Sequence, residues 1–458
     1  MPFATGSTFA SQFLQAQFKR RGHKVTVVGP NDPHAKPDDL PQPSVPMPSL
    51  PLRCVPGFYL PLPTRMALRR LSAEKFDVVI GQTSSALMDA GAYLRTTQNV
   101  PLICVNTAML SSIYDVILPE SMSASPVVQE ACQRYLVPFV EQASVRIYNN
   151  SDGLIVLSKG LERYWRELGV TVPIHVIPRS VNPKICSAEI GPDPYPSVAR
   201  RGSRLLVLCR HVREKSVSRI IDIFAEHVAK KVPEATLTLV GDGSDQDSFR
   251  KRANRLGVGD RVFFPGEVSV SEAPTWYSHG DLFLYASLSE TYGQVVSEAM
   301  YCGLPVVAMD DQAGVAQQIS HGKDGLLLSP GPDRAAANEV FGREVVDLLE
   351  RPQRRRALAE GARRSANYRA DPDRSIQRYY TAFEQARRHR ALSQPDVSTL
   401  GVATPLVKWA LLHSTVAGLG LLRPPGTLNR NGTKQPGWTE RTETTAEPAK
   451  QQRRSVNG

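Results

Sequence analysis

The stretch "DLFLYASLSETYGQVVSEAM", residues 281–300, decides the fold of this chain. It begins with the apolar run 281–288, which is typical of a strand buried on both faces of a parallel sheet. A polar turn follows, and the residues after Gly293 carry apolar side chains at helical spacing. We therefore predict a strand, a tight turn and a helix, which together form one unit of a doubly wound α/β domain.

Two carboxylates flank the glycine of this unit, Glu290 in the turn and Glu298 in the helix. If most of the interval is helical, a rise of ~1.5 Å per residue separates them by roughly 10–12 Å. A glycosidase holds its two acids closer together, at ~5–9.5 Å. The spacing favours an extended ligand such as a nucleotide diphosphate sugar, with hydroxyls at both ends and an anion at the helix N-terminus between them. A capping acid followed by a surface acid is the structural alternative.

The same alternation of strand and helix runs through most of the chain and predicts two doubly wound domains that face each other across a cleft. Apolar runs at 23–30, 76–83, 100–107 and 152–158 predict the first sheet, and runs at 204–210, 235–243, 261–267, 281–288 and 304–310 predict the second. Helical patterns lie at 7–22, 159–169 and 245–257. The predicted domains are 1–190 and 204–365, joined by a linker at 191–203 and followed by a helix at 366–390 that crosses back to the first domain.

The C-terminal part differs in composition from the rest. Residues 391–423 form an apolar or amphipathic extension, in which 400–422 is long enough to suggest a membrane span. Pro405, Lys408 and His413 argue against a spanning helix, so a helix at the membrane surface and a helix docked on the body are the two alternatives. Residues 424–458 are polar and rich in Pro, Gly and Thr, and we expect them to be disordered.

Composition limits the function classes. The 458 residues are 41% hydrophobic and 22% charged, which suits a globular enzyme, and the net charge of +11 predicts a phosphate-rich partner such as a nucleotide or an anionic membrane surface. No nucleic-acid motif or aromatic-interleaved basic ribbon is present, so we do not expect a nucleic-acid partner. The six cysteines are scattered, without a metal-binding spacing, and no secretory signal is visible, which favours a reducing cytoplasm.

Several segments resemble the retaining glycosyltransferases of family 4, which have the two-domain GT-B fold. The segment "SETYGQVVSEAMYCGLPVVA" is similar to the E-x7-E segment of that family, and "LCRHVREKS", "LVGDGSDQDSF" and "VFFPGEVS" look like its neighbouring blocks. The stretch "SDGLIVLSKGLERYWRELGV", followed by "IHVIPRSVNP", is similar to the end of its first domain. The resemblance covers roughly residues 4–390.

The resemblance implies a role for each matching residue. Arg210 and Lys215 would hold the donor pyrophosphate and offset the charge of the leaving group, and Glu290 would bind hydroxyls of the transferred sugar. Glu298 would bind the ribose diol. The remaining donor-binding positions are Gly6, Gly266 and Val268 at the nucleotide, and Tyr292, Gly293 and Gln294 at the helix N-terminus. These cations and the helix N-terminus make a metal unnecessary, so we expect no cofactor.

A second motif competes with this assignment. Asp245-Gln246-Asp247 is formally D-x-D, which binds a divalent metal in another class of glycosyltransferase. The motif follows a turn and opens a predicted helix, where acidic residues are favoured in any case. Helix capping is therefore the preferred interpretation.

The chain departs from the family pattern in three places. The family begins with an apolar strand before its glycine loop, whereas "ATGST" occurs here within the first eight residues; we expect a gap in the first sheet and a mis-set or truncated start. Asn106 and Thr107 stand near the place of a histidine close to the reacting sugar, so an acceptor-side role falls to them. Arg179 and Asn182 appear in "IPRSVN" where the family has "IPNGVD".

The predicted function is transfer of a hexose from a UDP- or GDP-linked sugar to an acceptor hydroxyl, with retention of configuration. The basic groups at 18–24 and 65–70 and the apolar 400–422 segment favour a lipid acceptor and an anionic membrane, with the protein on its inner, cytoplasmic face. A soluble glycan or small-molecule acceptor, or a non-catalytic relative that only binds nucleotide sugars, are the alternatives.

Overall fold

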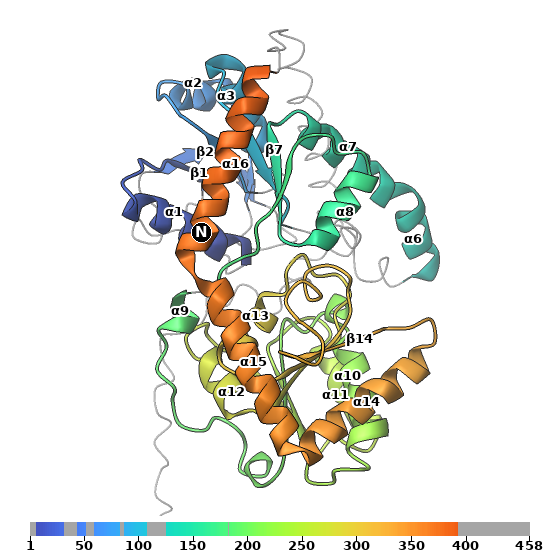
Figure 1. Cartoon of the computed structure of the whole chain (residues 1–458). Coiled ribbons are helices and arrows are strands. Elements are labelled where there is room, and N and C mark those ends of the chain that lie inside the picture. The colour runs from blue at the N-terminus through green and yellow to red at the C-terminus, as the bar shows by residue number, and fades with distance from the viewer. Residues whose placement is uncertain are drawn as a thin grey trace, which may run out of the picture.

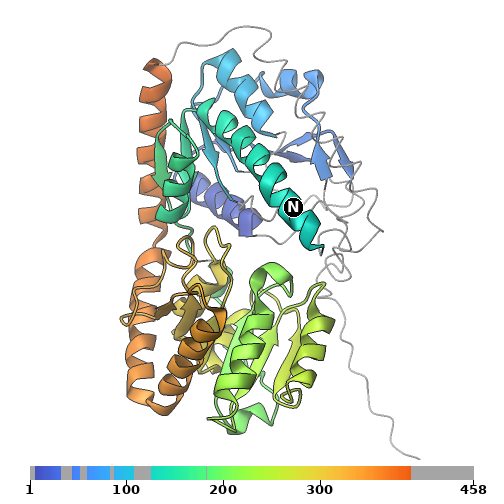
Figure 2. The same cartoon turned by 90° about the vertical axis from the view of Figure 1, so that its right-hand side faces the viewer.

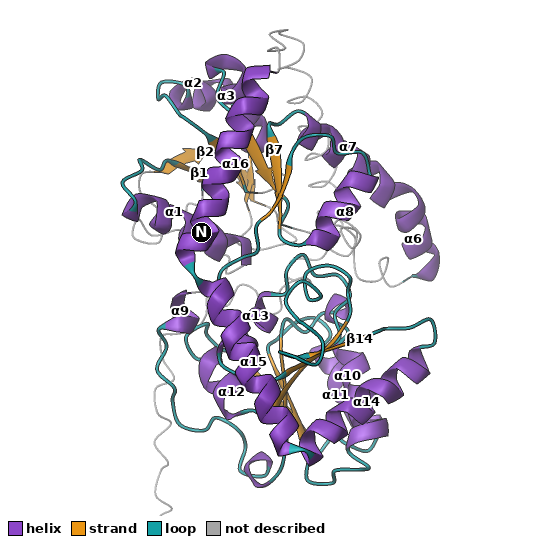
Figure 3. Cartoon of the chain, in the orientation of Figure 1, coloured by secondary structure: helices purple, strands orange, loops and turns teal. Residues whose placement is uncertain are grey.

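The computed structural model describes residues 6–31, 44–51, 59–82, 87–107, 125–181 and 183–392. They form two lobes, the N lobe and the C lobe, and each has a layer of strands with helices around it (Figures 1 and 3). The predicted extension beyond residue 392, the predicted disordered tail and Asn182 lie outside the described residues. Among the described residues no helix combines the length and the hydrophobicity that crossing a bilayer requires.

The C lobe contains one six-stranded parallel sheet in the order β11-β10-β9-β12-β13-β14. Its elements are β9 Arg204–Leu208, η4 Arg213–Lys215, α10 Val217–Ile223, η5 Phe224–Val228, β10 Thr236–Val240, α11 Gln246–Arg255, β11 Val262–Gly266, α12 Ala273–His279, β12 Leu282–Tyr285, α13 Gln294–Tyr301, β13 Val306–Met309, β14 Leu326–Leu328 and α14 Arg334–Glu350. Numbered within the lobe, this order is 3-2-1-4-5-6, that of a doubly wound dinucleotide fold. The order in which successive strands are added to the sheet reverses between the parallel strands β9 and β12, and this switch point is where such sheets bind ligands.

The five strands predicted for this lobe are all present, and the sheet explains their composition. Side chains of β10, β12 and β13 are buried along their whole length, because helices cover both faces of the sheet. The sixth strand, β14, lies at the sheet edge and is only three residues long, so the sequence search for longer apolar runs missed it.

The sheet of the N lobe is in two parts. Its elements are α1 Gly6–Arg20, β1 Val27–Pro30, β2 Ser44–Met47, β3 Ser49–Pro51, β4 Tyr59–Pro61, α2 Arg65–Leu71, β5 Val79–Gly81, α3 Leu87–Gln98, β6 Leu102–Val105, α6 Pro126–Ala131, η2 Cys132–Leu136, α7 Val137–Asn149, β7 Gly153–Val156, α8 Lys159–Glu167 and β8 Ile174–Val176. Strands β5-β6-β7-β8 form a parallel sheet, and β1 pairs in parallel with β2 in a separate sheet. Strands β3 and β4 form a small antiparallel pair beside them. In the strand order of the C lobe, a first strand would lie between β1 and β5, so the break falls where the sequence predicts a gap.

The strands on either side of the break in the N-lobe sheet are less buried than those further from it. Side chains of β6 and β7 are fully buried, whereas those of β1 and β5, on either side of the break, are only partly buried. The predicted loop "ATGST" is different in the structure, because its described residues 6–8 already belong to α1. The helix extends back to Gly6 while Leu14 and Phe18 anchor it in the core under α16.

The predicted linker packs against the C lobe. Tyr195 is fully buried, and its hydroxyl donates to the Trp276 carbonyl at 3.0 Å. Asp193 forms an ion pair with Arg204 at 3.0 Å, at the start of β9. The short elements α9 Pro183–Cys186 and η3 Ala199–Arg201 lie in this region. This segment is therefore attached to the C lobe along its length, although it is rich in proline and polar residues.

Two helices at the C-terminal end of the described chain run along both lobes, α15 Pro352–Ala370 on the C lobe and α16 Pro372–Leu392 on the N lobe (Figures 1 and 2). The predicted helix 366–390 is therefore wrong in its first residues, which belong to α15. Asp371 has an extended ψ of 112°, because Pro372 disfavours the helical conformation in the residue before it. The chain thus passes from the C lobe to the N lobe at a single residue, Asp371, between α15 and α16.

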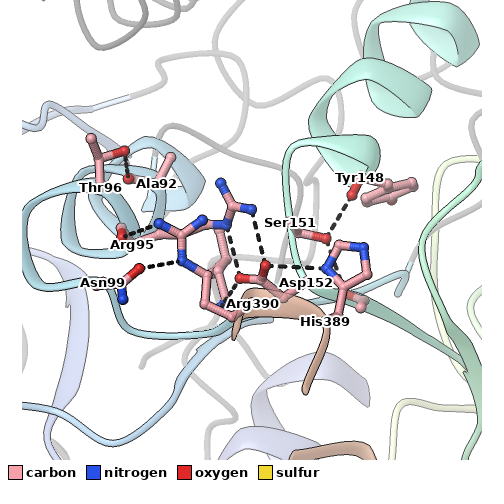
Figure 4. A network of polar contacts seen from close by, with 11 residues as sticks. Ala92, Arg95, Thr96, Asn99, Tyr148, Ser151, Asp152, His389 and Arg390 are labelled. Atoms are coloured by element: carbon pink, nitrogen blue, oxygen red, sulfur yellow. Dashed lines mark hydrogen bonds and ion pairs between the residues drawn. The ribbon is translucent and has the colours of Figure 1, made fainter. Parts of the chain in front are cut away.

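The end of α16 is held to the N lobe by the polar network in Figure 4. The Asp152 carboxylate is fully buried and accepts two hydrogen bonds from Arg95, at 2.8 and 2.9 Å. His389 of α16 lies 3.4 Å from the same carboxylate, and Arg390 donates to the Asn99 side chain at 2.9 Å. These contacts join α16 to the helix α3 and to the start of β7.

Candidate active site

Glu290 lies in the turn between β12 and α13 and is 8% exposed. Its Oε1 atom accepts hydrogen bonds from Lys215 Nζ at 2.5 Å, from the Tyr285 hydroxyl at 2.7 Å and from the Ser287 hydroxyl at 2.8 Å. Among the described residues, these three donors all engage Oε1, so Oε2 is the oxygen that can accept from a ligand. The carboxylate is thus fixed in orientation by three donors from the ends of two neighbouring strands.

The pair is held in its charged state. Burial alone would raise the pKa of Glu290, but the charge of Lys215 and the hydrogen bonds from Lys215, Tyr285 and Ser287 lower it overall. Burial likewise opposes the charge of Lys215, and the carboxylates of Glu290 and Glu214 raise the pKa of the ammonium group. Both groups therefore remain ionised around neutral pH.

Arg210 and Lys215 follow β9, and Glu290 follows β12, so all three lie at the switch point of the C-lobe sheet. Arg210 is exposed and takes part in no ion pair among the described residues. Lys215 has a second acidic neighbour, Glu214, at 3.5 Å. The structure therefore brings together the three residues to which the sequence assigns the chemistry.

Gly293 is the N-cap residue of α13 and has φ +76°, a left-handed conformation that favours glycine. The buried Gln318 side chain fixes this turn from behind: its Nε2 donates to the carbonyls of Tyr292, Gly293 (3.2 Å) and Gly314 (3.2 Å). The Gly293 carbonyl also accepts from the Val296 N–H at 3.0 Å, so Gln294 and Val295 supply the first-turn N–H groups of α13 that would face an anion.

Two of the predicted donor-binding side chains have other contacts. Tyr292 is 1% exposed and packs in the N-lobe core with Tyr148 and Trp165, so its ring does not line a donor site. Gln294 donates from Nε2 to the Ser180 carbonyl at 3.3 Å, across the boundary between the lobes. Only backbone groups of these two residues are left for the role that the sequence predicted.

Glu298 is the fifth residue of α13 and is also 8% exposed. Its Oε2 accepts from the Tyr277 hydroxyl at 3.3 Å, and the Gln294 side chain also bonds to the carboxylate. Among the described residues no cation forms an ion pair with it. Burial raises the pKa of Glu298 to about 7, and the two hydrogen bonds only partly offset that effect.

Gly266 and Val268, predicted at the nucleobase, lie at the carboxyl end of β11. Gly266 has φ +94° and its carbonyl accepts from Gly241 N at 2.8 Å, where the register between β10 and β11 shifts. Val268 packs on the C-lobe core. Between them, burial and the charge of Asp242 raise the pKa of Glu267.

Asn106 and Thr107, the predicted acceptor-side residues, lie at the carboxyl end of β6, facing the C lobe. Asn106 is buried and its Nδ2 donates to the Tyr148 hydroxyl at 3.3 Å. The Thr107 carbonyl accepts from the Thr291 hydroxyl at 3.4 Å, directly next to Glu290 in the chain. The structure therefore places Thr107 beside the Glu290 turn.

Gly6 is the first residue of α1, and its assignment to the donor stays a prediction. Asp245 and Asp247 lie at the start of α11, with Asp245 at the N-cap position and Asp247 in the first turn. The Asp245 side chain makes no capping hydrogen bond, so what the structure shows is the predicted place of the two acids at the helix start. Among the described residues no three His, Cys, Asp or Glu side chains gather as they would around a metal ion.

Sequence reasoning missed four residues that shape the site: Tyr285, Ser287, Gln318 and Tyr277. Tyr285 and Ser287 precede Glu290 at the end of the same strand, and this proximity was the available signal. Gln318 and Tyr277 come from segments 25 and 21 residues away from the groups that they contact, so the sequence carried no sign of them.

Two doubly wound lobes with the charged residues at the switch point of the second sheet define the GT-B class of glycosyltransferase fold. Two solved structures share it. HepE from Anabaena, in complex with UDP and glucose, has a TM-score of 0.60 and 20% identity, over 82% of this chain and 95% of that chain. Sucrose-phosphate synthase from Thermosynechococcus elongatus has a TM-score of 0.62 and 22% identity, over 83% and 94%.

Family models then identify the chain more closely. The model "Glycosyl transferases group 1" matches residues 200–365, and "Glycosyltransferase Family 4" matches residues 12–185. The matches correspond to the two lobes and together cover most of the chain. The chain belongs to this family of glycosyltransferases.

Curated relatives match shorter segments. The GDP-mannose-dependent alpha-(1-6)-phosphatidylinositol monomannoside mannosyltransferase of Mycolicibacterium smegmatis is 28% identical over 243 residues, which are 50% of this chain and 61% of that protein. The GtfA subunit of a UDP-N-acetylglucosamine–peptide N-acetylglucosaminyltransferase from Streptococcus gordonii is 31% identical over 157 residues, 34% and 29%. The chain thus spans less than two thirds of either relative.

Proposed function

We propose that this chain is a retaining hexosyltransferase that moves a hexose from a UDP- or GDP-linked sugar to an acceptor hydroxyl. The observation that carries the proposal is the pair of buried carboxylates around the N-terminus of α13. Glu290 is held ionised by Lys215, whereas no cation pairs with Glu298 in the described part of the chain. This arrangement suits a ligand with hydroxyl groups at both ends and an anion in the middle, because each buried carboxylate needs donors.

Each group has a distinct task in the proposed reaction. Glu290 Oε2 accepts hydrogen bonds from hydroxyls of the transferred sugar and sets its orientation. Arg210, Lys215 and the first N–H groups of α13 stabilise the diphosphate as negative charge develops on it. Glu298 accepts from the ribose diol.

In the proposed step the bond from the sugar's anomeric carbon to the diphosphate breaks, and the acceptor oxygen bonds to the same face. An oxygen of the departing phosphate takes the acceptor's proton, so no enzymic base is needed. Arg210 and Lys215 supply the charge stabilisation that a metal gives elsewhere, and we propose that the reaction proceeds without one.

Donor turnover tests the proposal. A panel of UDP-, GDP- and ADP-sugars is incubated with the wild type, with Glu290→Gln and with Glu234→Gln, an exposed acid of the C lobe, as the matched control. We expect release of nucleoside diphosphate from one donor class, lost in Glu290→Gln and retained in the control. Turnover that Glu290→Gln does not reduce would overturn the site assignment, and binding without any turnover would favour the non-catalytic alternative.

For the acceptor we propose a membrane lipid, reached from the cytoplasmic face of an anionic bilayer. The helix α2 supports this: Arg65, Arg69 and Arg70 are exposed beside Met66, which is 64% exposed. Relatives with lipid acceptors in their names point the same way, among them alpha-monoglucosyldiacylglycerol synthase of Streptococcus pneumoniae, 35% identical over 104 residues, 23% of each chain. Clustered arginines attract anionic lipids by about 1 kcal/mol each.

A soluble acceptor is the second candidate, because the apolar face of α2 is already used. Ala67, Leu68 and Leu71 are buried in the N-lobe core, so the helix offers the membrane only charge and one methionine. Binding to vesicles of anionic lipid decides between the two. Salt-sensitive binding that is lost on deleting residues 400–458 supports the lipid acceptor, and indifference to vesicles favours the soluble one.

A further inference from the structure

Arg179 lies where the chain leaves the N lobe, three residues after the end of β8. The carbonyl of the next residue, Ser180, accepts the hydrogen bond from Gln294, the first residue of α13. Arg179 is therefore next to the first turn of the helix whose N-terminus faces the proposed diphosphate site.

Among the described residues, no carboxylate pairs with the guanidinium group of Arg179. Its NH2 nitrogen is buried and has no hydrogen-bond acceptor, and its side chain forms no ion pair among the described residues. The hydroxyl groups of Tyr292 and Tyr379 lie close enough to interact electrostatically with this guanidinium group. Neither is an anion at neutral pH, because burial raises the pKa of Tyr292 and raises that of Tyr379 to about 12.

Among the described residues, two further arginines bring positive charge to this region. Arg369 of α15 and Arg378 of α16 interact electrostatically with the same Tyr292 hydroxyl as Arg179 does. The buried Nε of Arg369 also lacks a hydrogen-bond acceptor among the described residues. A buried cation without a counter-charge is costly, and folded proteins keep one where a ligand supplies the missing charge. The N-terminus of α13, beginning at Gly293, adds its own positive dipole.

We propose that Arg179 binds a phosphoryl group held at the first turn of α13. The inference rests on the proposed function and deepens it, since it adds a third cation to Arg210 and Lys215. A fork of N–H donors suits phosphate oxygens, and a phosphate brings the negative charge that the region lacks. The phosphoryl group belongs either to the nucleoside diphosphate or to a phosphorylated acceptor, and two measurements separate these sources.

The first measurement compares GDP with GMP, and UDP with UMP, by calorimetry. The proteins are wild type, Arg179→Gln, Arg179→Lys, and Arg378→Gln as the matched control, an exposed arginine near the same tyrosine. If the donor supplies the phosphoryl group, Arg179→Gln weakens diphosphate binding about 10- to 100-fold and leaves monophosphate binding within about twofold. Arg179→Lys keeps the charge and therefore loses less affinity for the diphosphate. The affinity of the control stays within about twofold of the wild-type value.

The second measurement uses inorganic phosphate with the nucleotide site saturated by whichever nucleoside diphosphate binds. If the acceptor supplies the phosphoryl group, phosphate raises the melting temperature of the wild type but not of Arg179→Gln, while nucleotide affinities are unchanged. Arg179→Gln that matches the wild type in both measurements would overturn the inference and leave the proposed function intact. A wild type that binds no nucleoside diphosphate would instead overturn the proposed function, and phosphate alone would then test Arg179.

Stability separates binding from a structural role. Without ligand, we expect Arg179→Gln to melt at the wild-type temperature or above it, because the substitution removes an unpaired buried charge. A lower melting temperature together with unchanged phosphoryl binding would show that the guanidinium acts only in packing.

Discussion

Glu290 and Glu298 are eight residues apart and equally buried, but their pKa values are shifted in opposite directions. Glu290 has Lys215 and two hydroxyl donors, and its pKa lies below the ordinary value. Glu298 has one hydroxyl and one amide, and burial raises its pKa to about 7. The difference comes from their place in the fold. Glu290 lies in a turn that meets the end of β9, whereas Glu298 lies inside a helix facing Tyr277.

This difference teaches how one short segment can serve two tasks. A carboxylate with a fixed ion pair is ready before the ligand arrives and suits the reacting sugar, where orientation matters most. A carboxylate that is poised near neutrality gains its charge when two hydroxyls bind it, which suits a ribose diol. We call this pair of carboxylates the clamp: Glu290 is its rigid end, at the sugar, and Glu298 is its responsive end, at the nucleoside.

The largest effect is expected from breaking the rigid end. Glu290→Gln removes the counter-charge of Lys215 and the acceptor for the sugar hydroxyls. We expect turnover to fall on the order of 10²- to 10³-fold and the free energy of unfolding to fall by about 3 kcal/mol, because Lys215 is left buried with only the more distant Glu214. Steady-state kinetics and urea unfolding measure the two effects.

The double substitution Glu290→Gln with Lys215→Met serves as the control. It removes both charges, so part of the lost stability should return while turnover stays low. Stability and turnover recovering together would contradict the assignment of Glu290 to the sugar.

The turn between the two carboxylates comes next. Gly293→Ala forces a side chain into φ +76° and brings a Cβ to 3.2 Å from Val315 Cγ2, so we expect a loss of about 1–2 kcal/mol in stability and weaker nucleoside diphosphate binding. Gly257→Ala is the matched control, since it has φ +72° and open space around it. Equal losses of nucleotide affinity in both variants would show that α13 does not hold the anion.

The responsive end predicts a smaller effect that depends on pH. Glu298 has a raised pKa in the folded chain, so its contribution to stability is full below about pH 4.5 and is lost as pH rises through about 7. Glu298→Gln should therefore match the wild type in acid and become the more stable of the two between pH 5 and 7, while binding nucleoside diphosphates about 10-fold more weakly. Thermal unfolding across pH checks the first effect. An advantage of the variant that is the same at every pH would contradict the raised pKa.

The smallest effect is expected from the D-x-D motif. Asp245→Asn with Asp247→Asn should change turnover by less than about twofold and leave its response to EDTA and to added Mg²⁺ or Mn²⁺ unchanged, since the motif starts α11. A loss of metal-stimulated turnover in this variant would restore the metal-binding interpretation.

The C lobe followed more closely from the sequence than the N lobe did. Buried parallel strands such as β12 are continuous apolar runs, and Gly293 marks the start of α13, so local pattern was sufficient there. In the N lobe β2, β3 and β4 are only three or four residues long and carry prolines, so their pairing depends on tertiary contacts that no local pattern encodes.

The candidate site shows the same limit. Glu290, Lys215 and Glu298 could be found from spacing and resemblance, but the direction of a side chain could not. The burial of Tyr292 in the N-lobe core and the unpartnered guanidinium of Arg179 depend on how the two lobes meet. Such contacts join residues far apart in the chain, and only the folded structure reveals them.

Proton release on nucleotide binding tests the central claim most directly. Calorimetric titration of GDP and UDP at pH 6.5, in buffers of different ionisation enthalpy, counts the protons that the complex loses. The terminal phosphate of the nucleotide releases protons in both proteins as it binds to the cations. The clamp predicts that the wild type releases about half a proton more than Glu298→Gln does, because the ribose diol converts Glu298 to its charged form. The same proton count in both proteins would contradict the assignment of Glu298 to the nucleoside.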